Sequence, residues 1–367
     1  MSPHDGGAAA LSFPHDAPPV PGTVAAVAPG IKWLRMPLPF ALDHINLWLI
    51  EERDGWVIVD SGLDTEETRR HWDEIFAHAL GGKPVTRLVV THFHPDHMGL
   101  AGWLTEKLKV PLWCTETEWL FARMLCLDDT GEFVANALDF YRRTGADEAT
   151  RAIFAGRGNP YRKRVSPVPH RFHRLSDGAT IEMSGREWRV IVGRGHAPEH
   201  ACLYCRDLDV LIAGDQVLPK ISPNVSLWPQ EPEANPLALY LASLETIKRE
   251  VPASALVLPS HGLPFRGLHT RIDQLASHHE ARLAELEVAC TEPRTCAEIV
   301  PVLFRRALDA HQLGFAIGET LAHLHYLVNR GRMSRAERAD GIYIYRRAFS
   351  EERPGSTATV DRRAATS

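Results

Sequence analysis

Short apolar runs alternate with amphipathic segments through most of the first 290 positions of the chain. Two apolar runs, 46–51 and 55–60, are joined through Asp54-Gly55, a dipeptide typical of a tight β-hairpin turn. The following segment, 64–82, has a helical pattern, and we expect Asp64 to cap it. Further strands are expected at 87–91, 110–114, 188–192, 201–205, 210–213 and 255–258, and further helices at 237–251 and 268–287. This mixture of strands and helices predicts an α/β fold in which helices cover sheets.

Four segments depart from this pattern. Residues 1–27 are rich in Pro, Gly and Ala and predict a flexible arm. Residues 115–180 have no strand pattern and predict a mostly helical insertion into a domain that spans 28–289. Residues 290–348 predict a small separate unit, and residues 349–367 a disordered tail.

The small unit at 290–348 combines helical patterns with a short strand pattern. Thr295 and Glu298 form a capping box, and a later helical stripe ends at Gly331. A strand pattern follows at 341–347. Helices followed by a β-ribbon favour a winged helix.

Composition and charge exclude few partners. The chain has 367 residues, 44% hydrophobic and 24% charged, with a formal net charge of −5, so no charge excess requires a nucleic-acid or membrane partner. We find no apolar run of about 18 residues and no secretory pattern, and we expect a cytoplasmic protein. The six cysteines show no disulfide framework. Cys202 and Cys205 face opposite sides of an expected strand, which favours core positions over a redox pair. The chain is also compatible with a homodimer.

Metal-type side chains crowd the loop after the strand expected at 87–91. His92, His94, Asp96 and His97 lie within six consecutive positions. Imidazole and carboxylate suit zinc, and iron and manganese accept the same ligands. One tetrahedral ion would not take all four ligands from one loop. The loop therefore predicts two metal ions with further ligands from elsewhere.

The further ligands are expected where other strands end. His196 follows 188–192, Asp215 follows 210–213, His261 follows 255–258 and Asp60 follows 57–59. Five strand ends with the same arrangement are a strong indication of one shared site.

The order and type of these residues resemble the metallo-β-lactamase-fold hydrolases over roughly residues 28–289. The resemblance implies an αββα sandwich with a helical insertion and, at 290–348, a small winged-helix domain. It implies one metal bound by His92, His94 and His196. It implies a second metal bound by Asp96, His97 and His261, and a bridge between the two metals from Asp215. Asp60 would orient a ligand histidine. The set is similar to that of glyoxalase II, and two zinc ions are the expected cofactors.

The implied chemistry is hydrolysis by a hydroxide that bridges the two metals. Asp215 would bridge the ions and Asp96 would orient the nucleophile, which makes both carboxylates catalytic. His200, Asn224 and Asn46 lie near the expected site, and each is compatible with a substrate contact, an outer contact to a ligand or a purely structural role.

Two substrate classes remain open. The first is a small ester, thioester or lactone. The alternative is a phosphodiester cleaved by an endoribonuclease-like nuclease, because residues 141–175 hold nine Lys/Arg against two Asp/Glu and the C-terminal unit resembles an extension found in a subgroup with a mitochondrial endoribonuclease. The lack of an overall basic excess favours the small-molecule substrate. A DNA-binding regulator would leave the metal ligands unexplained.

Overall fold

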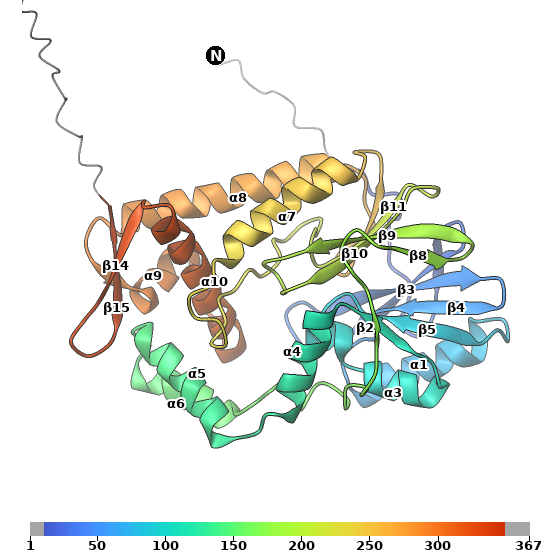
Figure 1. Cartoon of the computed structure of the whole chain (residues 1–367), viewed down its shortest axis with the longest axis horizontal. Helices are drawn as coiled ribbons and strands as arrows, with labels where there is room; N and C mark the ends of the chain where they lie inside the picture. The colour runs from blue at the N-terminus through green and yellow to red at the C-terminus, as the bar shows by residue number, and fades with distance from the viewer. Residues whose placement is uncertain (1–10, 349–367) are drawn as a thin grey trace, which may run out of the picture.

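Two β-sheets pack face to face at the centre of the molecule (Figure 1). The computed structural model describes residues 11–348, without the side chains of residues 310 and 311. The larger sheet has seven strands in sequence order: β1 (Ala25–Ala28), β2 (Ile31–Pro37), β3 (His44–Glu52), β4 (Gly55–Val59), β5 (Val85–Val89), β6 (Leu112–Cys114) and β7 (His173–Arg174). The smaller sheet has the order β12 (Leu256–Pro259), β11 (Val210–Gly214), β10 (His200–Cys205), β9 (Arg186–Gly193) and β8 (Thr180–Met183).

The strands bury both of their faces, as β3 illustrates. Trp48 and Ile50 point between the sheets, where they pack with Trp188 and other residues of the smaller sheet. Leu47 and Leu49 point the other way, into a second core under helices. Because side chains alternate across a strand, a run that is apolar at almost every position can serve two cores at once.

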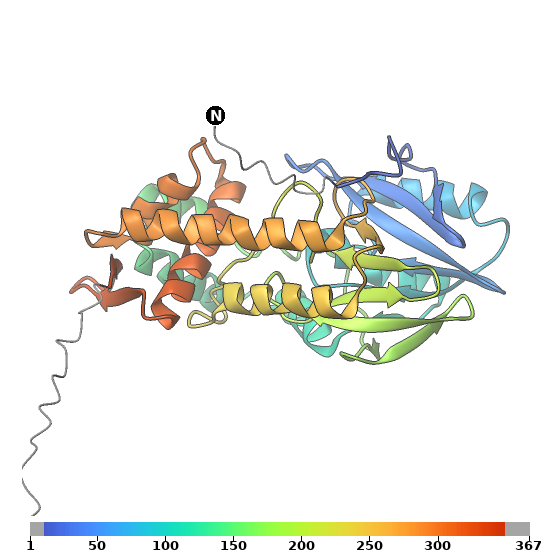
Figure 2. The same cartoon turned by 90° about the horizontal axis from the view of Figure 1, so that it is seen from above.

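Helices cover the outer face of each sheet (Figure 2). α1 (Glu66–His78) and α3 (Ala101–Leu108) bury residues such as Trp72 and Leu104 against the larger sheet. α7 (Pro236–Glu250) and α8 (Leu268–Ala289) bury residues such as Tyr240 and Leu275 against the smaller one. The αββα order of layers confirms the predicted fold class.

The insertion and the C-terminal unit lie together at one end of the sandwich (Figure 1). The insertion is mostly helical, as expected, and contains α4 (Glu116–Leu127), α5 (Gly131–Arg143) and α6 (Glu148–Arg157). The C-terminal unit contains β13 (Arg294–Thr295), α9 (Cys296–Leu303), α10 (Ala310–Asn329), β14 (Met333–Glu337) and β15 (Tyr343–Arg347). Both α6 and α8 contact α10. The unit thus joins two helices to a three-stranded sheet, and its assignment as a winged helix stays a prediction.

Three expectations need correction or fall outside the structure. Part of the expected flexible arm is held in place, because Ser12 exchanges backbone hydrogen bonds with Arg266 and because β1 pairs with β2. Asp64 does not cap α1. Its carboxylate binds Arg69, and the neighbouring Thr65 accepts the capping hydrogen bond. The expected tail, 349–367, lies outside the described residues. Within residues 11–348, no helix combines the length and apolarity needed to cross a membrane.

Candidate metal centre

The expected ligands come from loops that follow strands of both sheets. His92, His94, Asp96 and His97 lie after β5, the last three at or within the short helix α2 (Pro95–Met98). The smaller sheet supplies the rest: His196 after β9, Asp215 after β11 and His261 after β12. β9 and β11 are both antiparallel to β10, and β11 is parallel to β12, so all three strands end at the same edge. The fold therefore brings together side chains that lie up to 169 positions apart in the sequence, from His92 to His261.

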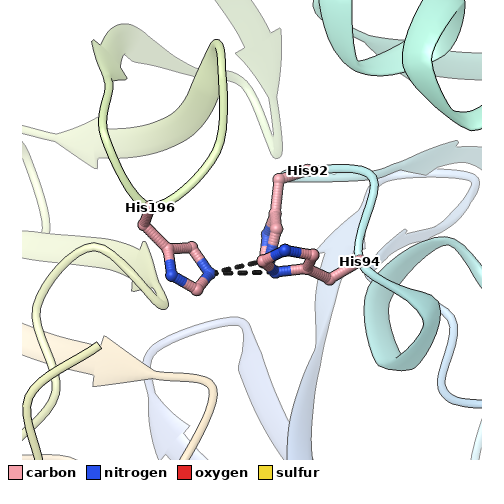
Figure 3. Close-up of side chains that lie close together, drawn as sticks. All are labelled: His92, His94 and His196. Atoms are coloured by element: carbon pink, nitrogen blue, oxygen red, sulfur yellow. Dashed lines mark hydrogen bonds between the residues drawn. The ribbon is translucent and has the colours of Figure 1, made fainter. Parts of the chain in front are cut away.

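Three imidazoles form the first part of the cluster (Figure 3). His92 Nε2 lies 2.9 Å from His94 Nδ1, and His196 Nε2 lies 3.1 Å from His94 Nδ1 and 3.2 Å from His92 Nε2. All three nitrogens thus point at one another across a small triangle. Such convergence of lone pairs from separate loops is typical of ligands around one ion.

Asp96, His97 and His261 form the second part. His261 Nε2 lies 3.4 Å from Asp96 Oδ2, and His97 Nε2 lies 3.8 Å from the same oxygen. Asp215 lies between the two parts. Its Oδ2 is 3.4 Å from His196 Nε2, and its Oδ1 is 3.3 Å from His261 Nε2 and 3.6 Å from His97 Nε2. One carboxylate therefore faces both sets of imidazoles.

The cluster fits divalent metal ions on its own geometry. Within the described residues, the buried atoms His97 Nε2 and Asp215 Oδ1 have no hydrogen-bond partner, which is costly unless a ligand satisfies them. Ligand atoms lie within 4.8 Å of one another in three overlapping groups: His92, His94 and His196; His92, His97 and Asp215; Asp96, His97 and His261. We refer to these seven residues as the metal-ligand cluster.

Charge in the second part of the cluster favours a cation. Burial alone would lower the pKa of His261, but the carboxylates of Asp215 and Asp96 outweigh it and raise that pKa to about 10. In the first part, burial and the nearby His196 lower the pKa of His94 to about 3. The second part thus attracts positive charge, while the first presents neutral imidazoles, the form that binds metals.

Most ligand imidazoles are oriented through their other ring nitrogen. His97 Nδ1 donates to Asp60 Oδ2 at 2.8 Å. His196 Nδ1 donates to the backbone oxygen of Asn224 at 2.8 Å, and His261 Nδ1 donates to that of His44 at 2.7 Å. His92 Nδ1 lies 3.1 Å from Thr91 Oγ1. Such contacts fix the ring orientation and the tautomer of a ligand.

His200 and Asn46 support ligand loops rather than line the site. His200 Nε2 accepts the backbone N–H of Asp215 at 3.1 Å, and its ring stacks on His92. Asn46 donates from Nδ2 to the backbone oxygens of Pro259 and Gly262, on either side of His261. Both side chains are fully buried, and their contacts favour the outer-contact role among the three left open by the sequence.

Glu118 is a site residue that the sequence reasoning missed. Its buried carboxylate accepts the backbone N–H of Phe93 at 2.8 Å and that of Glu199 at 2.5 Å. One side chain from α4 thereby ties the His92–His97 loop to the loop that carries His196. Burial raises the pKa of Glu118 to about 7, although the two N–H groups oppose that shift. The only sequence sign was an acidic residue on the inner face of an apolar helix pattern.

A cavity of about 1160 Å³ opens directly onto the cluster. Five ligands lie on its wall: His94, Asp96, His196, Asp215 and His261. Asn224 lines it as well, so that Asn224 both contacts a ligand through its backbone and faces the cavity. Most other lining residues are apolar or aromatic and come from α4, α5, α6, α10 and the loop 218–230.

Comparison with known proteins identifies the family. Residues 41–262 match the model of the metallo-beta-lactamase superfamily, and residues 283–348 match a metallo-beta-lactamase-like C-terminal domain. The chain belongs to the metallo-beta-lactamase superfamily. The resemblance stated from the sequence is thereby confirmed.

Three relatives illustrate the range of the superfamily. A crystal structure of a beta-lactamase domain protein from Burkholderia ambifaria is 47% identical, covers 92% of this chain and 98% of its own, and has a TM-score of 0.85. The probable metallo-hydrolase YqjP of Bacillus subtilis is 24% identical over 80% of this chain and 91% of its own. A linear primary-alkylsulfatase of a Pseudomonas species is 27% identical over 60% of this chain and 42% of its own. This chain is therefore a metallo-hydrolase of the superfamily.

Proposed function

We propose that the protein holds two zinc ions and hydrolyses an ester, thioester or lactone of a small molecule. The observation that carries the proposal is the position of Asp215, whose two oxygens face the imidazoles of two separate ligand sets. A carboxylate in that position is suited to bridge two ions. Bound there, the ion pair would supply an activated hydroxide and a Lewis acid for the substrate oxygen.

The side chains divide the remaining work. His92, His94 and His196 would hold one ion, and Asp96, His97 and His261 the other. Asp96 lies beside His97 and His261 and lines the cavity, so we assign to its carboxylate the task of orienting the nucleophile and accepting its proton. The hydrogen bonds of Asp60, Asn224 and His44 would keep the rings in place during the reaction.

Pairing of the basic residues argues against the nuclease alternative. In the insertion, Arg142 and Arg143 bind Asp139, and Arg162 binds Asp129. Arg332, Arg335 and Arg338 of the C-terminal unit pair with Glu287, Glu233 and Asp340 respectively. A phosphate track needs cations that are available to the backbone of the nucleic acid. These guanidinium groups already have carboxylate partners, which favours the small-molecule substrate.

Metal analysis together with a substrate panel tests the proposal. Protein purified without chelator should contain about two zinc ions per chain and hydrolyse carboxylic esters, thioesters or lactones, with activity lost on chelation. The panel also contains alkyl sulfates, because of the alkylsulfatase relative, and single-stranded RNA. Less than one ion per chain in active protein would contradict the two-metal site.

RNA cleavage would support the nuclease instead, under one further condition. The rate of RNA cleavage should then depend steeply on salt concentration. The double variant Arg162→Ala with Lys163→Ala should reduce the slope of the logarithm of kcat/KM against the logarithm of salt concentration by roughly 0.7 for each phosphate that it no longer binds. A flat salt response in both proteins would keep the small-molecule substrate.

We also propose a cytoplasmic location. All six cysteines are free thiols, which is typical of a reducing compartment.

A further inference from the structure

Helix α5 has an apolar face that no other part of the described protein fully covers. Phe133, Val134, Ala137, Leu138 and Tyr141 recur at helical spacing, so the helix is strongly amphipathic. Yet none of the residues of α5 is fully buried. A surface helix usually buries such a stripe in a core, so this arrangement needs an explanation.

The apolar face of α5 lines the cavity that reaches the metal-ligand cluster. All five residues of the stripe are on the cavity wall. The wall also includes Phe315 and Ala316 of α10 and Phe154 of α6. The ring of Phe154 stacks on that of Tyr141, with 3.9 Å between the ring centroids. Figure 1 shows how α4 connects α5 and α6 to the sheet that carries the ligand loop. The cavity thus joins the apolar face of the insertion to the reacting site, although polar side chains such as Arg157 and Arg164 also line it.

The walls suit a hydrocarbon better than a polar chain. A peptide or a sugar would need hydrogen-bond partners along its length, and a polar group left without a partner in an apolar cavity is costly. The backbone groups of α5 are used within the helix, and its cavity face carries phenyl, isopropyl, methyl and isobutyl groups, with the phenol of Tyr141 as its polar group. The volume of about 1160 Å³ also exceeds what a compact ester would need, since pockets for drug-sized ligands reach roughly 1,000 Å³.

We propose that the substrate carries an extended apolar acyl or alkyl chain, which lies along α5 while its ester-type group reaches the metal-ligand cluster. This assignment rests on the proposed function and narrows its substrate class. The stripe from Phe133 to Tyr141 extends over about 12 Å of helix, which matches a chain of roughly eight carbons or more. Burial of that chain supplies binding energy in proportion to its length.

A series of p-nitrophenyl esters from acetate to dodecanoate tests the proposal in the metal-loaded protein. The value of kcat/KM should rise by roughly two- to fourfold per methylene, because each buried methylene adds to binding, until the cavity is filled. Ala137→Trp should lower the ratio of kcat/KM for decanoate to that for acetate by at least tenfold, because the indole would occupy the cavity. Ala135→Trp is the matched control. Ala135 is exposed on the same helix, so kcat/KM for decanoate, kcat/KM for acetate and the ratio of the two should stay as in the wild type.

A second variant guards against a folding defect in Ala137→Trp. Gly314→Phe acts from α10, where an added Cβ would meet Phe154 and Tyr141 only at ordinary contact distances of 3.6 and 3.7 Å. It should lower the same ratio, and the thermal unfolding midpoint of each variant shows whether the fold is intact. An unchanged ratio in both folded variants would overturn the proposal.

A binding measurement separates this proposal from the proposed function. Decanoate should displace a fluorescent fatty acid from metal-free protein, and acetate should not. Ala137→Trp should weaken decanoate binding by at least tenfold. If these binding results hold but no ester, thioester or lactone is cleaved, the apolar-chain site stands and the proposed reaction falls. If esters are cleaved with no dependence on chain length and decanoate does not bind, the reaction stands and the apolar-chain site falls.

Discussion

The metal-ligand cluster and helix α5 form two parts of one cavity wall, but they are held in place differently. In the cluster, four ligand rings have a hydrogen-bond partner at the nitrogen that faces away from the other ligands, and His92 and His97 are completely buried. In α5, the ends are fixed by the Thr130 cap and by ion pairs with Asp139, while the apolar face meets the cavity. The first region fixes where atoms react. The second leaves a surface that can follow the shape of a substrate.

This difference teaches which changes should affect every substrate and which should affect only some. A change in the cluster alters the reacting centre itself. A change in the helices around the cavity alters how a substrate is held or how stable the fold is. Three substitutions at increasing distance from the cluster test that division.

The largest effect is expected from Asp215→Ala. Because Asp215 faces both ligand sets, its loss should remove more metal than His261→Ala, which should affect mainly one ion. Both variants should lower kcat by roughly 10²–10³-fold or more for short and long substrates alike. Elemental analysis and steady-state rates measure these effects. Loss of the same single ion in both variants would contradict the bridging position of Asp215.

A smaller effect is expected from Glu118→Gln. The amide nitrogen of glutamine would face a backbone N–H that the carboxylate now accepts, so one of the two hydrogen bonds to the loops cannot form. Metal affinity or kcat should fall by roughly 10- to 100-fold, with little change in the preference for chain length. Metal titration and the ester series measure both quantities.

The control for Glu118 is Glu116→Gln, an outward position on the same helix that pairs with Arg174. It should leave metal affinity unchanged. If the two variants behaved alike, Glu118 would have no part in positioning the ligand loops.

The smallest effect is expected from Glu319→Gln in α10, and it should depend on pH. Burial raises the pKa of Glu319 to about 7, above its ordinary value of 4.5. The folded protein therefore binds this proton more tightly than the unfolded chain, and the stability from that proton is present below pH 4.5 and is lost as pH rises through 7. Between pH 5 and 8 the free energy of unfolding of the wild type should fall by up to about 2 kcal/mol relative to that of the variant.

Urea unfolding at pH 5 and pH 8 measures this difference for Glu319→Gln. The same change at the exposed Glu245 serves as the control and should give no such pH dependence. A stability difference between wild type and Glu319→Gln that stays the same from pH 5 to pH 8 would show that Glu319 is ionised and well solvated in the fold.

The sequence by itself determined an α/β fold with helices over sheets and the identity of the metal-type residues, and its resemblance to the family implied the αββα order of layers. Five of the short apolar runs were followed within four positions by a His or Asp, and strand ends of one sheet meet at one edge, so these side chains could be expected to converge. Local signals also placed the capping box at Thr295, which the structure contains. Where a feature depends on a few neighbouring residues, the sequence was sufficient. The prediction that Asp64 caps α1 was wrong, because Arg69 binds the Asp64 carboxylate.

Only the tertiary structure decided which distant groups support the ligands and that the apolar face of α5 lines a cavity. Glu118 meets Glu199 across 81 positions, and Asn46 reaches Gly262 across 216. Such contacts depend on how separate elements pack, and a single residue in a helix or loop pattern carries no sign of its distant partner. The stripe of α5 was readable as apolar, but the same pattern serves a packed core or a cavity wall. The choice between them depends on the space that α6, α10 and the ligand loops leave beside it.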